Sequence, residues 1–529
     1  GGVGSGDSWS NAIKQLRDAL NWAANNWDGD TDGTLQIWVA EGTYLPTDDG
    51  TDREASFTLV DQVEIYGGFA GNESNLEERD PQANETILSG DIDQNDLAFE
   101  PQTDSDGDPS TPTQIDHIVG GNSYSVVYLK EDGVTVHLNG FTVTGGLADS
   151  DSSSGLVESD SGGGIFIDSD GGNVTMNTLT VKGNYGLDEG GGMFLRSGGR
   201  FSDTLFEYNV AEDGGGIWAF PSTQEPLYKN LIFRANHALN AGGGMFSGNI
   251  STMVNSLFVE NSARVAGGLL VARENMTIIG STFTRNSAEE VAGAIRTGLR
   301  ASLINVIIWD NELGGNKDIP EASFSSEINI DISSSIIANS GGSANWRVSE
   351  YADDGGGNLD VDPIFADPEN GDYSLSISSP AINRGDNTPF TSGGDAEGVT
   401  TDLAGNPRIY DGDPDPDVVD MGAYEFQDEP FGYPFIISPS NFETGVSAIP
   451  TFQWEEARLA EAYDLQLSLS PDFSSPVIDQ SGLATNEYSP SDELRYGVTY
   501  YWRVRGTSST LNGAWSSGQF QTTISNAGD

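Results

Sequence analysis

Alternating aspartates are the first residues of this sequence whose type and spacing could do chemistry. The segment "DGDTDG" (28–33) spaces its carboxylates two residues apart, as in the first half of a calcium-binding loop. The closing glutamate of such a loop would fall at Val39, so a complete loop is not expected. "DSDGD" (104–108) and "DGDPDPD" (411–417) alternate in a comparable way. We expect the first two segments to bind Ca²⁺ unless they form ordinary solvated turns. The carboxylates concerned are Asp28, Asp30, Asp32, Asp104, Asp106 and Asp108.

A group of five arginines in the middle of the chain could bind an acidic polysaccharide. Abstraction of a proton beside a uronate carboxylate builds negative charge, which a cation must neutralise. Residues 201–310 hold ten acids and seven bases, a charge of −3, whereas the whole chain carries −58. A nearly neutral segment in so acidic a chain indicates a contact face, although stacked repeats also carry few charges. The arginines are Arg264, Arg273, Arg285, Arg296 and Arg300.

The remaining residue types do not complete a catalytic set. Cysteine is absent, which excludes disulfides, thiolate catalysis and thiolate metal sites. His117, His137 and His237 match no cluster of aspartates of the kind that inverting glycoside hydrolases use. His237 follows Asn236 at an expected turn, so we expect it to be exposed to solvent. The sequence therefore names no catalytic residue.

The overall charge limits the partners of this chain. Its 81 acidic residues against 23 basic ones repel nucleic acid and anionic membranes. Such acidity suits a protein that stays soluble in salt water or that binds many divalent cations. No apolar run approaches the roughly 20 residues of a membrane span, so no membrane insertion is expected. The chain opens on "GGVGSGDSW" without a signal peptide, which suggests a piece of a longer exported protein.

A repeat of about 25 residues organises the middle of the chain. Glycine triplets begin at 162, 190, 214 and 242 and decay to "AGGLL" at 266 and "AGAIR" at 292. Between them runs a second series, a hydrophobe three residues before an asparagine, as in "FRAN" (233–236) and "FVEN" (258–261). The asparagines are Asn184, Asn209, Asn236, Asn261, Asn286 and Asn311, and "IIAN" suggests a seventh at Asn339.

Short β-rich runs at this period, with glycine turns and no helices, predict the coils of a parallel β-solenoid. The hydrophobe of each station should point into the bore. The asparagine should lie at the following turn and hydrogen-bond to its counterparts in a ladder of amides. A second polar column lies six positions before each asparagine. It consists of Thr178, Asp203, Asn230, Asn255, Gly280 and Asn305. A phosphate-binding loop would need a helix after the triplet, and none follows, so we interpret the glycines as structural corners.

This alternation of "FxxN" with "GG[AG][ILVM]" resembles the repeat of bacterial polymorphic outer membrane proteins, within the broader pectate-lyase-like β-helix class. The resemblance covers about 160–340 and implies a right-handed helix, which agrees with the chirality of parallel crossovers. Members of the outer membrane family continue into a membrane barrel, which this chain does not show.

The two ends of the repeat predict a cap and further coils. Residues 8–25 place Trp9, Ile13, Leu16, Leu20 and Ala23 on one helical face, so we expect a helix that closes the first coil. The early coils should draw their strands from the segments 35–46, 57–69, 85–92 and 125–146.

After Asn339 the glycine repeat stops, and the C-terminal part of the chain has a different sequence pattern. Three segments resemble the choice-of-anchor Q region of bacterial surface proteins, and this resemblance implies surface display. They lie within 358–386, 402–409 and 419–426. From about 435 alternating strands such as "AYDLQLSLS" (462–470) resemble a fibronectin type III module. We therefore predict an all-β chain. Residues 1–430 form a right-handed parallel β-helix with its cap helix at 8–25, repeat coils at 160–340 and the anchor-like part at 341–427. A β-sandwich follows at 431–529.

The ladder regularity, the anchor-like region and the missing catalytic set favour a non-enzymatic protein. We expect an extracellular or bacterial cell-surface adhesin, glycan-contacting stalk or assembly subunit, with a carbohydrate, a cell-surface partner or another copy as its partner. One alternative is a Ca²⁺-dependent polysaccharide lyase or glycoside hydrolase that acts on acidic polysaccharide, with the arginine group as its site. Another is an extracellular filament subunit. Fold analogy alone does not decide between them.

Overall fold

The computed structural model describes most of the chain and divides it into two units. Described residues are 5–97, 117–150, 159–220, 222–248, 251–272, 275–317, 319, 324–326, 330–410 and 418–524. The first unit comprises 1–361, 385–408 and 421–424, and the second comprises 362–384, 409–420 and 425–529. Each unit is described by itself.

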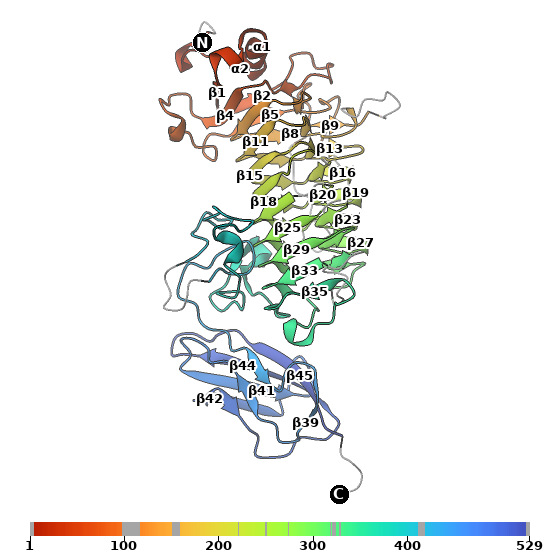
Figure 1. The fold of residues 1–529 in the computed structure, drawn as a ribbon, viewed down its shortest axis with the longest axis vertical. Helices are drawn as coiled ribbons and strands as arrows, with labels where there is room; N and C mark the ends of the chain where they lie inside the picture. Colours follow the sequence, from red (N-terminus) through yellow and green to blue (C-terminus); the bar gives the residue numbers. More distant parts are fainter. Residues whose placement is uncertain are drawn as a thin grey trace. The chain divides into compact units, whose positions relative to one another are not determined.

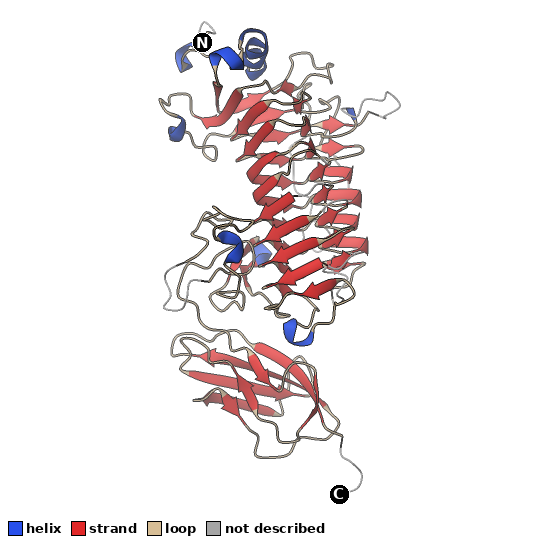
Figure 2. Cartoon of the chain, in the orientation of Figure 1, coloured by secondary structure: helices blue, strands red, loops and turns tan. Residues whose placement is uncertain are grey.

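The first unit is a parallel β-solenoid whose coils contribute strands to four columns (Figures 1 and 2). The first column contains β1 (Leu35–Ala40), β4 (Val63–Phe69), β7 (Thr135–Asn139), β11 (Asn173–Asn177), β21 (Ser251–Val254), β25 (Met276–Ile279), β29 (Ala301–Ile304), β33 (Ile330–Ser333) and β35 (Ala352–Asp354). The second contains β2 (Gly42–Tyr44), β5 (Thr86–Ser89), β8 (Thr142–Thr144), β12 (Thr180–Lys182), β22 (Leu257–Val259), β26 (Thr282–Thr284), β30 (Ile307–Trp309) and β34 (Ile336–Ile337). The long strands β15 (Gly199–Glu207) and β18 (Leu227–Arg234) run through both columns and join them, among the described residues, into one 19-stranded sheet.

The other two columns close each coil. The third contains β9 (Leu147–Ala148), β13 (Tyr185–Gly186), β16 (Val210–Asp213), β19 (His237–Ala241), β23 (Ser262–Val265), β27 (Ser287–Val291) and β31 (Glu312–Leu313). The fourth contains β3 (Phe57–Thr58), β6 (Val127–Leu129), β10 (Ile165–Asp168), β14 (Met193–Arg196), β17 (Ile217–Ala219), β20 (Met245–Ser247), β24 (Leu269–Val271), β28 (Ile295–Thr297) and β32 (Phe324–Ser326). All pairings within these columns are parallel, and the solenoid is of the right-handed type that the sequence predicts.

Equivalent residues of successive coils stack on one another in the bore. Phe233 pairs with Phe206 of the coil before and with Phe258 of the coil after, in register. The rings of Phe206, Phe233, Phe258 and Phe283 are stacked, with centroids 5.2, 4.4 and 4.5 Å apart. All four are buried, so the predicted inward hydrophobes are confirmed.

Three left-handed corners turn each coil. The first corner is the polar column, in which every member from Thr178 to Asn305 has φ between 51° and 57°. The second is the residue before each ladder asparagine, for example Ala235 and Glu260. The third is the first residue of the glycine triplet, with φ of 65–71° at Gly162, Gly190, Gly214 and Gly242 and of 58° at Ala266. Three abrupt turns of the same hand allow a short segment to close into a coil.

The asparagines form the predicted ladder. From Asn184 to Asn286, each Nδ2 donates to Oδ1 of the asparagine one coil later, at 2.9–3.0 Å. The backbone N–H of each donates to the same Oδ1 at 3.0–3.1 Å. The Nδ2 also donates to a carbonyl one coil earlier, as from Asn261 to Phe233. Each fully buried amide therefore joins three coils and satisfies corner groups that no strand partner reaches.

The glycine triplets and the asparagine stations depend on each other. A Cβ on Gly192 would lie 2.5 Å from the carbonyl oxygen of Gly216 and 3.0 Å from Nδ2 of Asn209. A Cβ on Gly191 would lie 2.3 Å from the carbonyl oxygen of Val210. At Gly191 and Gly192 the close approach of the backbone and the amide ladder therefore leaves no room for a side chain, whereas the first residue of the triplet forms the left-handed corner.

The seventh asparagine station is wrong by one residue. Ile308 pairs with Ile337 rather than with Ile336, so the ladder position of that coil falls on Ser340. Asn339 occupies the second corner instead, with φ of 64°. Buried Ser340 donates from Oγ to the carbonyl oxygen of Ile337 and ends the column.

The N-terminal cap is shorter than predicted. Residues 16–26 form α1 (Leu16–Asn26), whereas Trp9 lies in a separate 3₁₀ turn, η1 (Trp9–Asn11). The helix buries Leu16, Leu20 and Ala23 over the bore, as the sequence predicts. Further helical turns named in the described part of this unit are α2 (Gly29–Asp32), η2 (Leu76–Glu78), η5 (Ser343–Asn345) and η7 (Thr388–Phe390). None of the helices in the described part of the chain is long and apolar enough to span a membrane.

Segments 385–408 and 421–424 cover the outer face of the later coils. Outward-facing Leu257, Thr282 and Ile307 are buried, and the Oγ of Thr282 accepts a hydrogen bond from the N–H of Ala423. Buried Arg408 donates from Nη2 to the carbonyl oxygen of Gly422. A Cβ on Gly280 would lie 2.5 Å from that Nη2, which explains the single glycine in the polar corner column.

The second unit is built of antiparallel sheets. Strands β36 (Phe365–Asp367) and β37 (Asp372–Leu375) pair beside η6 (Pro368–Asn370). One sheet contains β38 (Ile436–Ser438), β40 (Phe452–Trp454) and β43 (Glu487–Tyr488). The other contains β39 (Glu443–Val446), β45 (Ser516–Thr522), β44 (Thr499–Thr507), β41 (Ala462–Ser468) and β42 (Ile478–Leu483), with β39 parallel to its neighbour. Trp454, Trp502 and Phe452 lie in the core of these sheets.

Removal of one ladder amide should destabilise the solenoid. Asn261→Ala deletes the acceptor of the Asn236 N–H and two donated bonds, and it leaves buried polar groups without partners. We expect a loss of about 3 kcal/mol in the free energy of unfolding. Chemical denaturation measures it, and Thr277→Ala, on the outer face of β25, is the control. Equal stability of the two variants would contradict the ladder as a stabilising element.

Gly280→Asn should loosen the covering segment 385–408. Asparagine tolerates the left-handed corner, so the expected effect comes from the collision of its side chain with Arg408. Limited proteolysis should cut this segment faster than in the native chain. Asp203→Asn, in the same corner column, should leave the cleavage rate unchanged.

Candidate functional site

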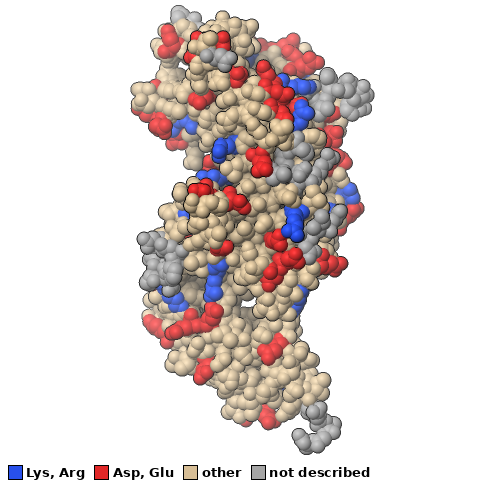
Figure 3. Space-filling model, viewed as in Figure 1, with Lys and Arg blue, Asp and Glu red and all other residues tan. Residues whose placement is uncertain are grey.

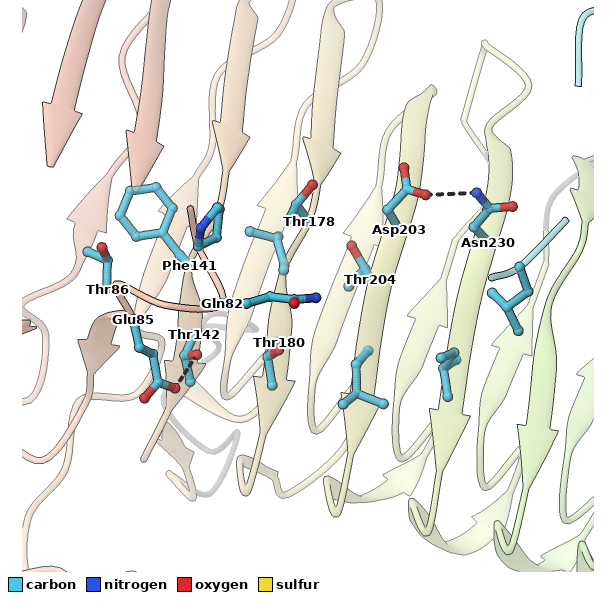
Figure 4. Close-up of a pocket in the computed structure, with 16 residues that line it drawn as sticks. Gln82, Glu85, Thr86, Phe141, Thr142, Thr178, Thr180, Asp203, Thr204 and Asn230 are labelled. Carbon is cyan, nitrogen blue, oxygen red and sulfur yellow. Dashed lines mark hydrogen bonds between the residues drawn. The ribbon is translucent and has the colours of Figure 1, made fainter. Parts of the chain in front are cut away.

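A groove of about 350 Å³ runs across the outer face of four neighbouring coils (Figure 4). Its floor is the outward row of the second column, in which Thr142, Thr180, Leu205 and Ile232 are in register. Four strands at parallel-sheet spacing give the floor a length of roughly 15 Å. We name this feature the corner groove because its wall is the first left-handed corner.

The polar corner column forms one wall of the corner groove. Thr178, Asp203 and Asn230 border it, and Asn230 donates from Nδ2 to Oδ1 of Asp203 at 2.7 Å. The positive φ angle at these positions turns the chain sharply, so their side chains stand at the edge of the strand face. The loop 81–86 supplies further lining residues, and Figure 4 shows Gln82 pointing along the groove towards Thr204.

The corner groove is polar and carries only negative charge. Its two charged lining residues are Glu85 and Asp203, and the described residues place no lysine or arginine in the lining. The Oγ of Thr142 donates to Oε1 of Glu85 at 2.8 Å. Hydroxyl, amide and carboxylate groups beside Leu205 and Ile232 are able to accept and donate hydrogen bonds along an extended polar chain.

The same corner column is exposed at one end and covered at the other. Asn255 donates to the carbonyl oxygen of Thr401 at 2.6 Å, and Asn305 donates to that of Asp386 at 2.8 Å. The groove ends at Leu403, where the covering segment begins. The cover therefore decides which part of a repeated surface is open to a ligand.

The sequence-predicted arginines lie at different places on the solenoid. Arg264 is in β23 and lies 2.6 Å from Glu290. Arg285, at a second corner, has Glu260 at 4.0 Å and Asp310 at 3.7 Å. Arg296 lies in the fourth column, Arg300 is 3.7 Å from Asp331, and Arg273 lies outside the described residues. The structure brings no three of the four described arginines together, and the binding role of the group stays a prediction.

Acidic and basic side chains lie beside each other in several places on the face shown in Figure 3. Pairs of neighbouring coils share such contacts, as between Arg234 and Glu207 at 3.2 Å and between Arg264 and Glu290 at 2.6 Å. Exposed pairs of this kind contribute little to stability. These contacts neutralise charges locally within residues 201–310. The low net charge of this segment is therefore not by itself evidence of a continuous positively charged surface.

The predicted calcium ligands are only partly described. Residues 29–32 form the short helix α2, and the carboxylate of Asp32 accepts the backbone N–H of Asp28 at 3.3 Å. Asp104, Asp106 and Asp108 and the segment 411–417 lie outside the described residues, as does the side chain of Asp30. Within the described ranges, no three His, Asp or Glu side chains are arranged to hold a metal ion.

The prediction that His237 is exposed is wrong. Its side chain is partly buried, its Nδ1 lies 2.7 Å from the Oγ of Ser262, and burial lowers its pKa. Because strand β19 follows the corner directly, the histidine stacks on the next coil rather than entering solvent. His117 lies with its Nε2 3.2 Å from the carbonyl oxygen of Gly183.

His137 belongs to a polar network that the sequence did not reveal. The Tyr66 hydroxyl donates to Oε2 of Glu64 at 3.0 Å and lies 3.2 Å from Nδ1 of His137. The other ring nitrogen of His137 is 2.9 Å from Oδ1 of Asn177. Burial and the nearby Glu64 raise the pKa of Tyr66 to about 12. These residues lie on three successive strands, with Glu64 in register with His137, and none of them lines the corner groove, so they cross-link the early coils.

Comparisons with known protein families, with curated proteins and with solved structures return no match for this chain.

A loop at the N-terminal side carries a titrating carboxylate. Asp96 accepts hydrogen bonds from the N–H of Val119 at 2.7 Å and from Nδ2 of Asn122 at 2.8 Å. Burial, with a smaller contribution from the charges of Asp91 and Asp93, raises the pKa of Asp96 to about 6.

The stability of this loop should fall as the pH rises from about 4 to about 6. Over this range the folded loop retains a proton on Asp96 that the unfolded segment has released, so ionisation destabilises the fold. Hydrogen exchange of the amides of Asn95 and Val119, corrected for intrinsic rates, measures it. Asp96→Asn should remove the pH dependence, and Asp18→Asn should preserve it. A pH-independent opening in the native chain would contradict the raised pKa.

Proposed function

We propose that this chain is a non-enzymatic, extracellular β-solenoid protein of a bacterial cell surface that binds an extended neutral glycan along the corner groove. The observation that carries the proposal is the lining of the groove. It offers threonine hydroxyls, amides and apolar side chains along four coils, with two carboxylates and no cation among the described lining residues.

The charge of the groove favours a neutral or amino sugar chain over a polyanion. A uronate chain would place its carboxylates against Glu85 and Asp203 without a cation to offset the repulsion. The chain's net charge of −58 adds to that repulsion. A polyhydroxylated ligand without charge needs only hydrogen-bond partners and apolar contacts, and both line the floor.

Two alternatives remain separate proposals. A polysaccharide lyase or hydrolase would need positioned acid–base groups at the bound chain, and the described groove lining offers Glu85 and Asp203 alone. A Ca²⁺-dependent reaction of this kind would draw its metal from the acidic loops. A filament subunit would use the ends of the solenoid rather than its side.

We infer that residues 431–529 are a fibronectin type III-like spacer and that residues 341–427 are an anchor-type region of a displayed protein. The antiparallel sheets around Trp454 and Trp502 support a sandwich at 431–529. A spacer of this kind would hold the solenoid away from the surface to which the chain is attached.

Thr180→Trp should abolish glycan binding because the large ring fills the floor of the corner groove. Thr175→Trp is the matched control. Both threonines face outward from neighbouring strands of the same coil and are partly buried, but Thr175 lies outside the groove. Affinity electrophoresis against neutral β-glucan, galactomannan and polygalacturonate measures binding. Release of reducing ends and of unsaturated product is measured on the same polymers.

The expected result is retardation by a neutral polymer for the native chain and for Thr175→Trp, and no retardation for Thr180→Trp. Binding of polygalacturonate alone, or product release that Thr180→Trp abolishes, would sink the proposal and favour the lyase or hydrolase. Equal binding by both variants would place the glycan elsewhere.

A further inference from the structure

A second hollow, of about 870 Å³, lies at the N-terminal end of the solenoid. Its lining includes η1 and α1 on two sides and every residue of β1 from Leu35 to Ala40. Figure 1 shows α1 beyond β1 at this end of the stack. Aromatic side chains are concentrated here, and they are Trp9, Trp22, Trp38 and Tyr44.

The hollow follows the open edge of β1. Successive side chains of a strand point to opposite faces, so a hollow bordered by all of them must lie along the strand edge. β1 pairs with β4 on one side only. The N–H groups of Leu35 and Glu41 donate towards β4, which leaves those of Gln36 and Trp38 directed away from it by alternation. Among the described residues outside β1 and β4, neither of these two N–H groups has a backbone partner.

The cap leaves this edge incompletely covered. Inward-facing Leu35 and Ile37 are only partly buried, whereas their partners Val63 and Ile65 in the next coil are fully buried. On the other face, Trp38 stacks on Phe69 at 4.9 Å, and Trp9 lies 5.4 Å from the same ring. Trp22 of α1 is 48% exposed. The edge therefore lies in a slot with an apolar inner side and an aromatic outer side.

We propose that this slot binds an extended peptide segment of another protein as an additional β-strand, one in which apolar residues alternate with lysine or arginine. The unpaired edge supplies main-chain hydrogen bonds, as in other cases of strand addition. Apolar side chains of the added strand would cover Leu35 and Ile37 beside α1. The basic ones would face the outer side, where the charged lining residues are Asp7 and Glu73. A second copy of this chain is disfavoured because it brings −58 of like charge.

Isothermal titration calorimetry of the full chain with an acetylated Lys-Val-Lys-Val-Lys-Val amide tests the proposal. Gln36→Pro removes the outward N–H, and proline is tolerated on an edge strand where the N–H points away from its partner. Trp22→Lys places a repelling charge in the slot on an exposed helix position. Ala24→Lys, exposed on the same helix and outside the lining, is the matched control. Thermal unfolding confirms that each variant is folded.

The proposal expects binding of the lysine peptide to the native chain and to Ala24→Lys. It expects affinity about tenfold weaker or worse for Gln36→Pro and Trp22→Lys, the loss of one hydrogen bond or more. A Glu-Val peptide should not bind. Absence of binding, equal binding of both peptides, or affinity unchanged in both variants would overturn it. Self-association of the native chain that Gln36→Pro abolishes would overturn it in favour of a second copy.

Discussion

The buried asparagine amide is the interaction on which the rest of the solenoid depends. A coil that turns three times in about 25 residues must bury corner backbone groups that no strand partner reaches. The amide has one acceptor oxygen and two donor hydrogens, which bond to both neighbouring coils at once, as at Asn261. It can do so only where the facing backbone approaches closely. That requirement places a glycine opposite most of the asparagines, for example Gly192 opposite Asn209.

One corner column serves two purposes through what lies over it. Over the early coils Thr178 and Asp203 remain exposed, and with the more deeply buried Asn230 they border a groove. Over the later coils the same positions bind the covering segment through Asn255 and Asn305, and Gly280 leaves room for Arg408. A repeated scaffold thus gains one open site by covering the remainder of an equivalent surface. Such an arrangement fits a protein in which most of the solenoid is structural and ligand binding is confined to one part of its surface.

The distribution of charge also indicates that most of the solenoid surface is structural. Arginines on the trunk lie beside carboxylates of neighbouring coils, so the nearly neutral middle of the chain is a balanced surface. The groove and the edge slot both carry acidic residues as their only charged lining residues in the described chain. Both sites should therefore disfavour an anionic ligand, which agrees with the proposed neutral polar chain at the side and the proposed basic apolar strand at the end.

The sequence by itself determined the coil. Period, inward hydrophobes, asparagine ladder and glycine corners all follow from it, because each residue in a solenoid contacts its own counterpart one repeat away. The prediction failed by one residue at Asn339, where the glycine triplets that mark the register have ended. The tertiary structure alone decided the groove, the cover and the edge slot. Gln82, Thr180 and Leu403 meet only because separate segments return to one face. Contacts of this kind do not repeat at a fixed interval along the chain, so no spacing in the sequence predicts them.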